Sequence, residues 1–257
     1  MNSFIDSHAH IYLDDFNNQI ENIIDNSIKN NVDKILMPNI NLKTVNSMKN
    51  LSLKYEGVCF SMLGLHPCYV EDNYEKEIND IFKFFDSEII AIGEIGLDYY
   101  QSDKTFTNQL KAFELQCEIA IEKKLPIVIH TRNSIDESIN VIKKYSNKNI
   151  NGVFHCFTGN LKQANQIIDL GFKIGVGGIL TFKNSHLKDV ISKIDLSSIL
   201  LETDSPYLSP EPNRGKINEP SNIKYIAEKL SDILSVPLEL VSKVTSQNAN
   251  NLFDLSS

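Results

Sequence analysis

Short apolar segments alternate with amphipathic segments along the whole chain. The apolar segments predict eight strands, over Phe4–Ser7, Ile35–Pro38, Val58–Leu65, Ile89–Gly93, Pro126–Ile129, Val153–Phe154, Phe172–Val176 and Ile199–Leu201. Most of these segments are apolar throughout rather than at alternate positions. Continuous apolarity is typical of strands that are buried on both faces, as in a parallel sheet.

Several of the intervening segments repeat their apolar positions with helical spacing. One such face gathers Phe106, Leu110, Phe113, Cys117 and Ile121, and another gathers Ile223, Ile226, Ala227, Leu230, Ile233 and Leu234. Pro220 and Ser221 stand where the second helix should begin. Strands alternating with helices indicate βαβ units, and eight of them favour an α/β fold, a single (β/α)₈ TIM barrel spanning residues 1–257.

Other architectures and locations are disfavoured by missing motifs. No G-x-G-x-x-G or G-x-x-x-x-G-K-[ST] motif opens a helix, which weakens a dinucleotide-binding or P-loop interpretation. No run of 18 apolar residues and no signal peptide is visible, so we expect a cytoplasmic protein without a membrane span. The four cysteines form no C-x-x-C pair, and reduced, mostly buried thiols are expected.

The net charge of −8 argues against a basic surface that grips duplex DNA through many phosphates. It does not exclude a nucleic-acid enzyme that touches few phosphates, because bound divalent ions would reverse the local sign of the site.

Five of the six histidines fall at or just after the end of a predicted strand; they are His8, His10, His66, His130 and His155. In a (β/α)₈ barrel these strand ends converge on one face, where active sites are built. His186 lies in a predicted helix, where a surface role is the default expectation.

His8 and His10 are two residues apart at the end of the first strand. Side chains at i and i+2 of a strand point to the same side, so both imidazoles can reach one cation. A structural origin of the H-x-H pair is the alternative. Asp6 is a candidate acceptor for a ligand histidine, with a structural turn role as its alternative.

Four further candidates each end a different strand: Glu94, His130, His155 and Asp204. Each histidine taken alone is also compatible with a satisfied core position. Carboxylates that follow buried strands are costly unless they are paired or bind a metal. Histidine and carboxylate ligands together suit Zn²⁺, Mn²⁺ or Fe, and Mg²⁺ when water completes the site. His66 is predicted to orient a substrate phosphate or to shape a turn.

Seven segments contain the candidate residues in order along the chain: Phe4-Ile-Asp-Ser-His-Ala-His, Gly64-Leu-His-Pro, Gly93-Glu-Ile-Gly-Leu-Asp-Tyr, His130-Thr-Arg, His155-Cys-Phe-Thr-Gly, Leu201-Glu-Thr-Asp-Ser-Pro-Tyr-Leu and Arg214-Gly-Lys-Ile-Asn-Glu-Pro. With these segments the chain resembles a known family, the TatD family of metal-dependent deoxyribonucleases. One departure is visible, because Ile11-Tyr12 stands between the H-x-H pair and Leu13-Asp14.

The resemblance implies a barrel of the amidohydrolase type with two divalent metal ions (Mg²⁺, Mn²⁺ or Zn²⁺). His8, His10, Glu94 and Asp204 would hold one ion, and Glu94 would bridge to a second held by His130 and His155. Two such ions activate a water molecule and stabilise the attacking and departing oxygens. Asp204 and Glu94 are therefore the predicted catalytic residues, with Asp204 orienting or deprotonating the water.

Basic residues in loops after strands predict the substrate-binding set, which is Arg132, Lys183, Arg214 and Lys216 together with His66. A solvated surface charge is the alternative for each cation. Tyr99, Phe157 and Tyr207 are candidates for base stacking, with core packing as the alternative.

These residues favour an exonuclease that takes single-stranded or frayed DNA ends, because a duplex is too wide for a narrow barrel mouth. We infer no obligate protein partner and no membrane partner. The alternatives are a D-aminoacyl-tRNA deacylase, a small-molecule amide or ester hydrolase with the same dinuclear site, and a non-catalytic binding protein.

Overall fold

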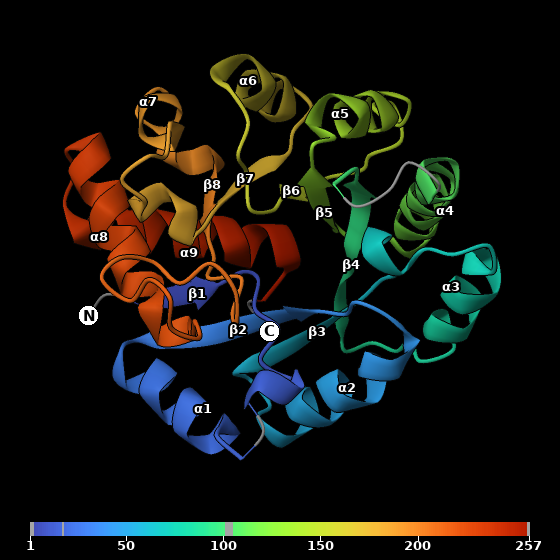
Figure 1. The fold of residues 1–257 in the computed structure, drawn as a ribbon, viewed down its shortest axis with the longest axis horizontal. Coiled ribbons are helices and arrows are strands. Elements are labelled where there is room, and N and C mark those ends of the chain that lie inside the picture. Colours follow the sequence, from blue (N-terminus) through green and yellow to red (C-terminus); the bar gives the residue numbers. More distant parts are fainter. Residues whose placement is uncertain (1–2, 17, 101–104, 256–257) are drawn as a thin grey trace.

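Eight parallel strands stand at the centre of the molecule and helices surround them (Figure 1). The computed structural model describes residues 3–16, 18–100 and 105–255. Each strand pairs with its neighbours in chain order: β1 Phe4–Asp6, β2 Val32–Pro38, β3 Cys59–Leu63, β4 Ile89–Asp98, β5 Ile127–Arg132, β6 Gly152–Phe154, β7 Lys173–Val176 and β8 Ile199–Leu201. All eight predicted strands are therefore present.

The barrel closes between the segments that follow β1 and β8. Ala9 and Ser205 form a parallel bridge. The amide of His10 donates to the Ser205 carbonyl at 2.7 Å, and the amide of Asp204 donates to the His8 carbonyl at 2.9 Å. This closure confirms the predicted TIM barrel, and it places predicted ligands from both ends of the chain in one hydrogen-bonded seam.

Two strands run further than their apolar segments predict. β4 continues to Asp98, and β5 continues to Arg132. Glu94 and His130 therefore lie inside strands rather than after them. The extension is stabilised by ladder pairs such as Gly96 with His130 and Asp98 with Arg132, beyond an irregularity between Ile92 and Ile95. The prediction ended each strand at its first polar residue, but Glu94 and His130 point into the barrel mouth while their backbones remain paired in the sheet.

The described helices are α1 Ile20–Lys29, α2 Val45–Lys54, α3 Tyr74–Phe82, α4 Phe106–Lys123, α5 Ile135–Lys143, α6 Leu161–Asp169, α7 Leu187–Ile191, α8 Ile223–Leu234 and α9 Leu238–Phe253. Two of them, α4 and α8, cover the two amphipathic faces predicted from sequence. Pro220 begins a short 3₁₀ turn, Pro220–Asn222, directly before α8. None of these helices is long and apolar enough to cross a membrane.

One end of the barrel is filled by apolar side chains and covered by α9, which crosses behind the strands in Figure 1. Seven strands each contribute one residue to this cluster: Ile5, Leu36, Met62, Ala91, Val128, Val153 and Leu200. Ala249 and Phe253 of α9 pack against them. The opposite end, where the strands finish, is left for polar side chains, and we call it the mouth of the barrel.

Candidate metal centre

The mouth brings together five histidines and two carboxylates from six strand ends. The six predicted ligands His8, His10, Glu94, His130, His155 and Asp204 all lie in this cluster, and His66 joins them from the end of β3. The largest sequence separation among these residues, between His8 and Asp204, is 196 positions, so only the closed barrel brings all of them together.

Glu94 lies at the centre of the cluster, and its two carboxylate oxygens face different histidines. Oε2 lies 3.3 Å from His8 Nε2 and 3.4 Å from His10 Nε2. Oε1 lies 2.8 Å from His130 Nδ1 and 3.2 Å from His155 Nε2. One carboxylate therefore faces two separate nitrogen pairs, which is the arrangement that a bridging ligand needs.

Asp204 completes the group around the H-x-H pair. Its Oδ1 lies 3.7 Å from the Nε2 atoms of both His8 and His10. His66 belongs to the other side, because its Nε2 lies 3.4 Å from Glu94 Oε1 and its Nδ1 accepts the Cys68 amide. His66 was predicted to contact substrate or shape a turn; the structure places it in both the turn and the ligand cluster.

The cluster has the charge of a cation site. In the described part of the chain, the ion-pair partners of Glu94, Asp204, Asp98 and Glu202 are histidines, and no lysine or arginine pairs with them. Burial raises the pKa of the Asp204 carboxyl to about 6. Burial also opposes ionisation of Glu94, but the surrounding histidines outweigh it and hold its pKa well below the usual range.

The donor atoms are a mixture of imidazole nitrogens and carboxylate oxygens, which fits a divalent metal ion. His8 Nε2 and His10 Nε2 approach each other at 3.1 Å, and both face carboxylate oxygens. Converging imidazole nitrogens with carboxylate oxygens suit Zn²⁺ or Mn²⁺.

Three residues that touch the ligands were not assigned a role from sequence. The Asp98 carboxylate lies 2.9 Å from His130 Nε2, and Glu202 Oε1 lies 3.2 Å from His155 Nδ1. Asp98 and Glu202 stand inside the quoted motifs, but linear spacing does not reveal which imidazole nitrogen each one faces.

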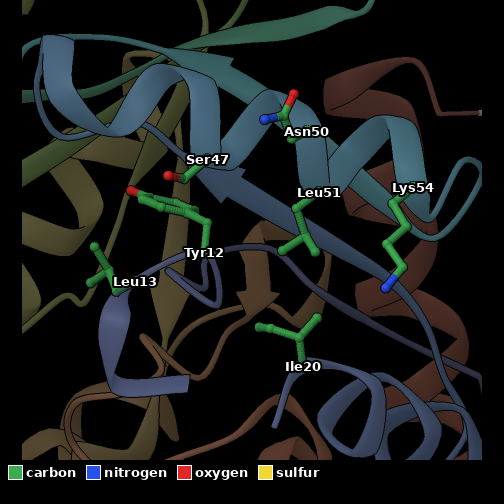
Figure 2. A pocket seen from close by; sticks show the side chains of 7 residues that line it. All are labelled: Tyr12, Leu13, Ile20, Ser47, Asn50, Leu51 and Lys54. Carbon is green, nitrogen blue, oxygen red and sulfur yellow. The ribbon is translucent and has the colours of Figure 1, made fainter. Parts of the chain in front are cut away.

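The third is Tyr12, which belongs to the departure noted after the H-x-H pair. Its hydroxyl lies 2.9 Å from His10 Nδ1 and donates to the Pro38 carbonyl at 2.5 Å. Its ring lines a separate hollow of about 200 Å³ between the segment after β1 and helix α2, shown in Figure 2. Tyr12 therefore connects the metal cluster to a cavity that contains none of the predicted ligands.

Asp6 does not contact an imidazole, so its predicted role as acceptor for a ligand histidine is wrong. Its carboxylate accepts the amides of His8 and Thr203 and the Thr203 hydroxyl. Asp6 thus fixes the backbone that carries His8, because three donors from both sides of the seam meet on one buried carboxylate.

The predicted cationic residues Arg132, Lys183, Arg214 and Lys216 are all exposed; Arg132 is the last residue of β5, and the other three lie in segments that follow strands. The Arg132 guanidinium lies 3.7 Å from the Tyr100 ring centroid, and Arg214 lies 3.6 Å from that of Phe182. None of the four contacts a ligand carboxylate within the described ranges.

The aromatic candidates separate into different environments. Phe157 is 2% exposed, so its predicted stacking role is wrong and its packing role holds. Tyr99 packs on Phe106 with ring centroids 3.9 Å apart. Tyr207 is 51% exposed and lies 6.3 Å from the His10 ring. Tyr69, which sequence reasoning missed, is 44% exposed and lies 6.2 Å from His66.

The remaining histidine and the thiols lie outside the ligand set. His186 immediately precedes α7 and is exposed, with Nε2 3.2 Å from the Thr158 carbonyl. All four cysteines are free; Cys59 and Cys117 are buried, Cys156 is half-buried and Cys68 is exposed.

Comparison with known proteins agrees with the geometry. Residues 5–254 match the model of the family described as TatD related DNase. A metal-dependent hydrolase of Buchnera aphidicola is 37% identical, with 98% of this chain and 99% of that protein covered. The metal-dependent hydrolase YabD of Bacillus subtilis is 31% identical over 98% of this chain and 99% of its own. Both are described as uncharacterized.

Solved structures are similar over the full barrel. The TatD homolog YjjV of Escherichia coli superposes with a TM-score of 0.92 at 29% identity, covering 98% of both chains. A TatD family hydrolase of Entamoeba histolytica superposes with a TM-score of 0.86 at 25% identity, covering 100% of this chain and 99% of its own.

Proposed function

Because the chain belongs to the TatD-related DNase family and is a metal-dependent hydrolase, we propose that it hydrolyses phosphodiester bonds at single-stranded or frayed DNA ends. The observation that carries the proposal is the division of the Glu94 carboxylate between two groups of histidines. One group is His8 and His10 with Asp204, and the other is His130 and His155. We assign one divalent ion to each group.

Two ions held there would supply an activated water molecule and neutralise charge that develops on the phosphate oxygens. Asp204 is the group that orients this water and takes its proton. Without a bound metal, burial raises the pKa of the Asp204 carboxyl to about 6, so this carboxylate is ionised at neutral pH. Tyr12 and Asp98 orient His10 and His130 from outside the cluster.

Support for a nucleic-acid substrate comes from the residues around the cluster. Arg132, Lys183, Arg214 and Lys216 offer exposed positive charge in a protein of net charge −8. Tyr207 and Tyr69 offer exposed rings, whose centroids lie 6.3 Å from that of the proposed ligand His10 and 6.2 Å from that of His66, respectively. Aromatic rings beside cationic side chains suit single strands, because bases stack on the rings while phosphates meet the cations.

The test uses protein reconstituted with Mn²⁺, Mg²⁺ or Zn²⁺ and two single strands of equal length, one linear and one circular. We expect the linear strand to be trimmed and the circle to survive, since the circle has no end to enter the mouth. Activity should disappear with chelator and return with metal.

Other outcomes lead to different conclusions. Equal cleavage of the linear and the circular strand would contradict the dependence on ends but would still support nuclease activity. No cleavage of either, with hydrolysis of D-aminoacyl-tRNA or of a small ester, would replace the proposed substrate. Full turnover after exhaustive chelation, with no metal detected, would contradict the metal mechanism itself.

A further inference from the structure

Three buried polar atoms beneath the metal cluster have no hydrogen-bond partner. They are His8 Nδ1, His155 Nδ1 and Glu202 Oε2. Nitrogen and oxygen atoms of these three residues lie within 4.8 Å of one another. A buried polar atom without a partner is destabilising, so three in one place require an explanation.

The two histidines are held face to face. Their rings stack with centroids 3.6 Å apart and planes inclined by 11°. Each ring directs its Nε2 to a different oxygen of Glu94, at 3.3 Å for His8 and 3.2 Å for His155. A neutral imidazole that binds a cation through Nε2 carries its proton on Nδ1. Both rings would then present an Nδ1–H donor away from the metals.

Glu202 is the acceptor placed beside those donors. It directly follows β8 and is 0% exposed. Its Oε1 accepts the Cys156 amide at 2.5 Å and lies 3.2 Å from His155 Nδ1 without forming a hydrogen bond. A Cβ atom added at Gly175 would lie 2.5 Å from Oε2, so the glycine leaves the space that this carboxylate fills.

We propose that Glu202 is a positioning residue shared by the two metal sites, accepting the Nδ1 protons of His8 and His155. It would fix the tautomer of one ligand of each ion and couple the two sites to each other. The inference rests on the two-metal assignment proposed above. A third cation in the same place is disfavoured, because it would need both imidazoles to lose their second proton.

The decisive variant is Glu202→Gln, which preserves the shape of the side chain but turns one acceptor oxygen into an amide donor. The control is Asp98→Asn, since Asp98 contacts a ligand of only one site, His130. Zn²⁺ affinity of metal-free protein is measured by chelator competition and by calorimetry. We expect Glu202→Gln to lower the affinity for Zn²⁺ at both sites by roughly 10–100-fold, and Asp98→Asn to lower the affinity at one site only.

A second measurement uses the wild-type chain and does not depend on a folded variant. In ¹⁵N-histidine-labelled, Zn²⁺-loaded protein, NMR should show that the Nδ1 atoms of His8 and His155 carry protons, and that these protons are hydrogen-bonded and exchange slowly with solvent. Ring nitrogens without such protons would overturn the proposal.

The remaining outcomes are distinct. If the wild type binds two ions but Glu202→Gln lowers the affinity at only one site or at neither, the shared role of Glu202 is overturned and the two-metal proposal is kept. A single ion in the wild type would overturn both the coupling and the two-metal proposal. A third ion that Glu202→Gln abolishes would replace positioning with direct ligation. A nuclease assay that fails while both metal sites respond as expected would contradict only the substrate.

Discussion

At the scale of single residues, the polar groups of the mouth depend on one another. Glu94 is 2% exposed and faces four histidine nitrogens within 3.4 Å besides one from His66. A carboxylate so placed is stable only among groups that offset its charge. The lone pairs of converging imidazole nitrogens repel one another, and a bound cation would offset that repulsion. The cost of burying Glu94 and the needs of a metal site are therefore both met by the same carboxylate and histidines.

Removal of Glu94 is the sharpest test at this scale. Glu94→Ala should lower metal content and turnover together, by more than about 100-fold, because it removes a ligand rather than a supporting contact. The barrel should remain folded, since its apolar cluster lies at the other end. Elemental analysis, circular dichroism and turnover check this. Glu88→Ala, at an exposed position before β4, is the control. Two ions and normal turnover in Glu94→Ala would show that Glu94 is no bridge.

At the scale of elements, the seam between the ends of β1 and β8 carries three of the six proposed metal ligands, His8, His10 and Asp204. Asp6 and Thr203 are both 0% exposed, and the Thr203 hydroxyl donates to Asp6 Oδ2 at 2.5 Å. The same hydroxyl contacts Ser205 at 2.6 Å. Side-chain hydrogen bonds thus complete the closure of a barrel whose first and last strands are only three residues long.

Thr203→Val keeps the shape of this side chain and removes its donor. We expect the free energy of unfolding of metal-free protein to fall by about 1–3 kcal/mol, because the buried Asp6 carboxylate loses a partner. Urea unfolding followed by circular dichroism measures the loss. Thr203→Ser, which retains the hydroxyl, should lose less. Equal stability of the valine variant and wild type would show that the seam does not depend on this bond.

At the scale of the whole molecule, the apolar packing that stabilises the fold and the polar residues of the candidate metal centre lie at opposite ends of the barrel. α9 and the apolar cluster occupy one end, and the ligands occupy the other. The acidic chain concentrates buried carboxylates at the mouth, while Arg132 at the end of β5 and Arg214 in a loop are exposed. Fields from such an arrangement would guide an anionic substrate toward bound cations.

Metal binding should strengthen as pH rises. In the metal-free protein, burial opposes protonation of His155, but the charges of Glu202 and Glu94 outweigh it and raise its pKa well above the ordinary value. The pKa of His130 is raised in the same way by Asp98 and Glu94. A cation must displace these protons, so the apparent affinity should increase up to about tenfold per pH unit for each proton displaced. Chelator competition between pH 6 and 8 measures this, and a flat profile would contradict it.

Substrate capture should depend on salt and on the loop cations. Arg214→Ala should raise the KM for single-stranded DNA roughly tenfold through loss of a charge-assisted contact, with metal content unchanged. The slope of log affinity against log salt should also become shallower by about 0.7. Lys123→Ala, at the end of α4 away from the mouth, is the control. An unchanged KM and slope would place Arg214 outside the DNA path.

Sequence pattern alone determined the elements and the ligand types. Continuous apolar segments predicted all eight strands because burial on both faces excludes polar residues. His8 and His10 were assigned to one side from the two-residue period of a strand, and their Nε2 atoms do meet at 3.1 Å. Strand ends were placed less well, because Glu94 and His130 are polar but remain in the ladder.

The tertiary structure decided which atoms face which. That Asp6 serves the backbone, that Phe157 is buried, and that Tyr12 and Glu202 lie behind the ligands could not be derived from spacing. These contacts join segments as far apart as Asp6 and Thr203, and they depend on how the closed barrel rotates each strand end. Local pattern reports whether a residue is buried and on which side of its own strand it lies. Only closure brings the first strand against the last, and that contact builds the site.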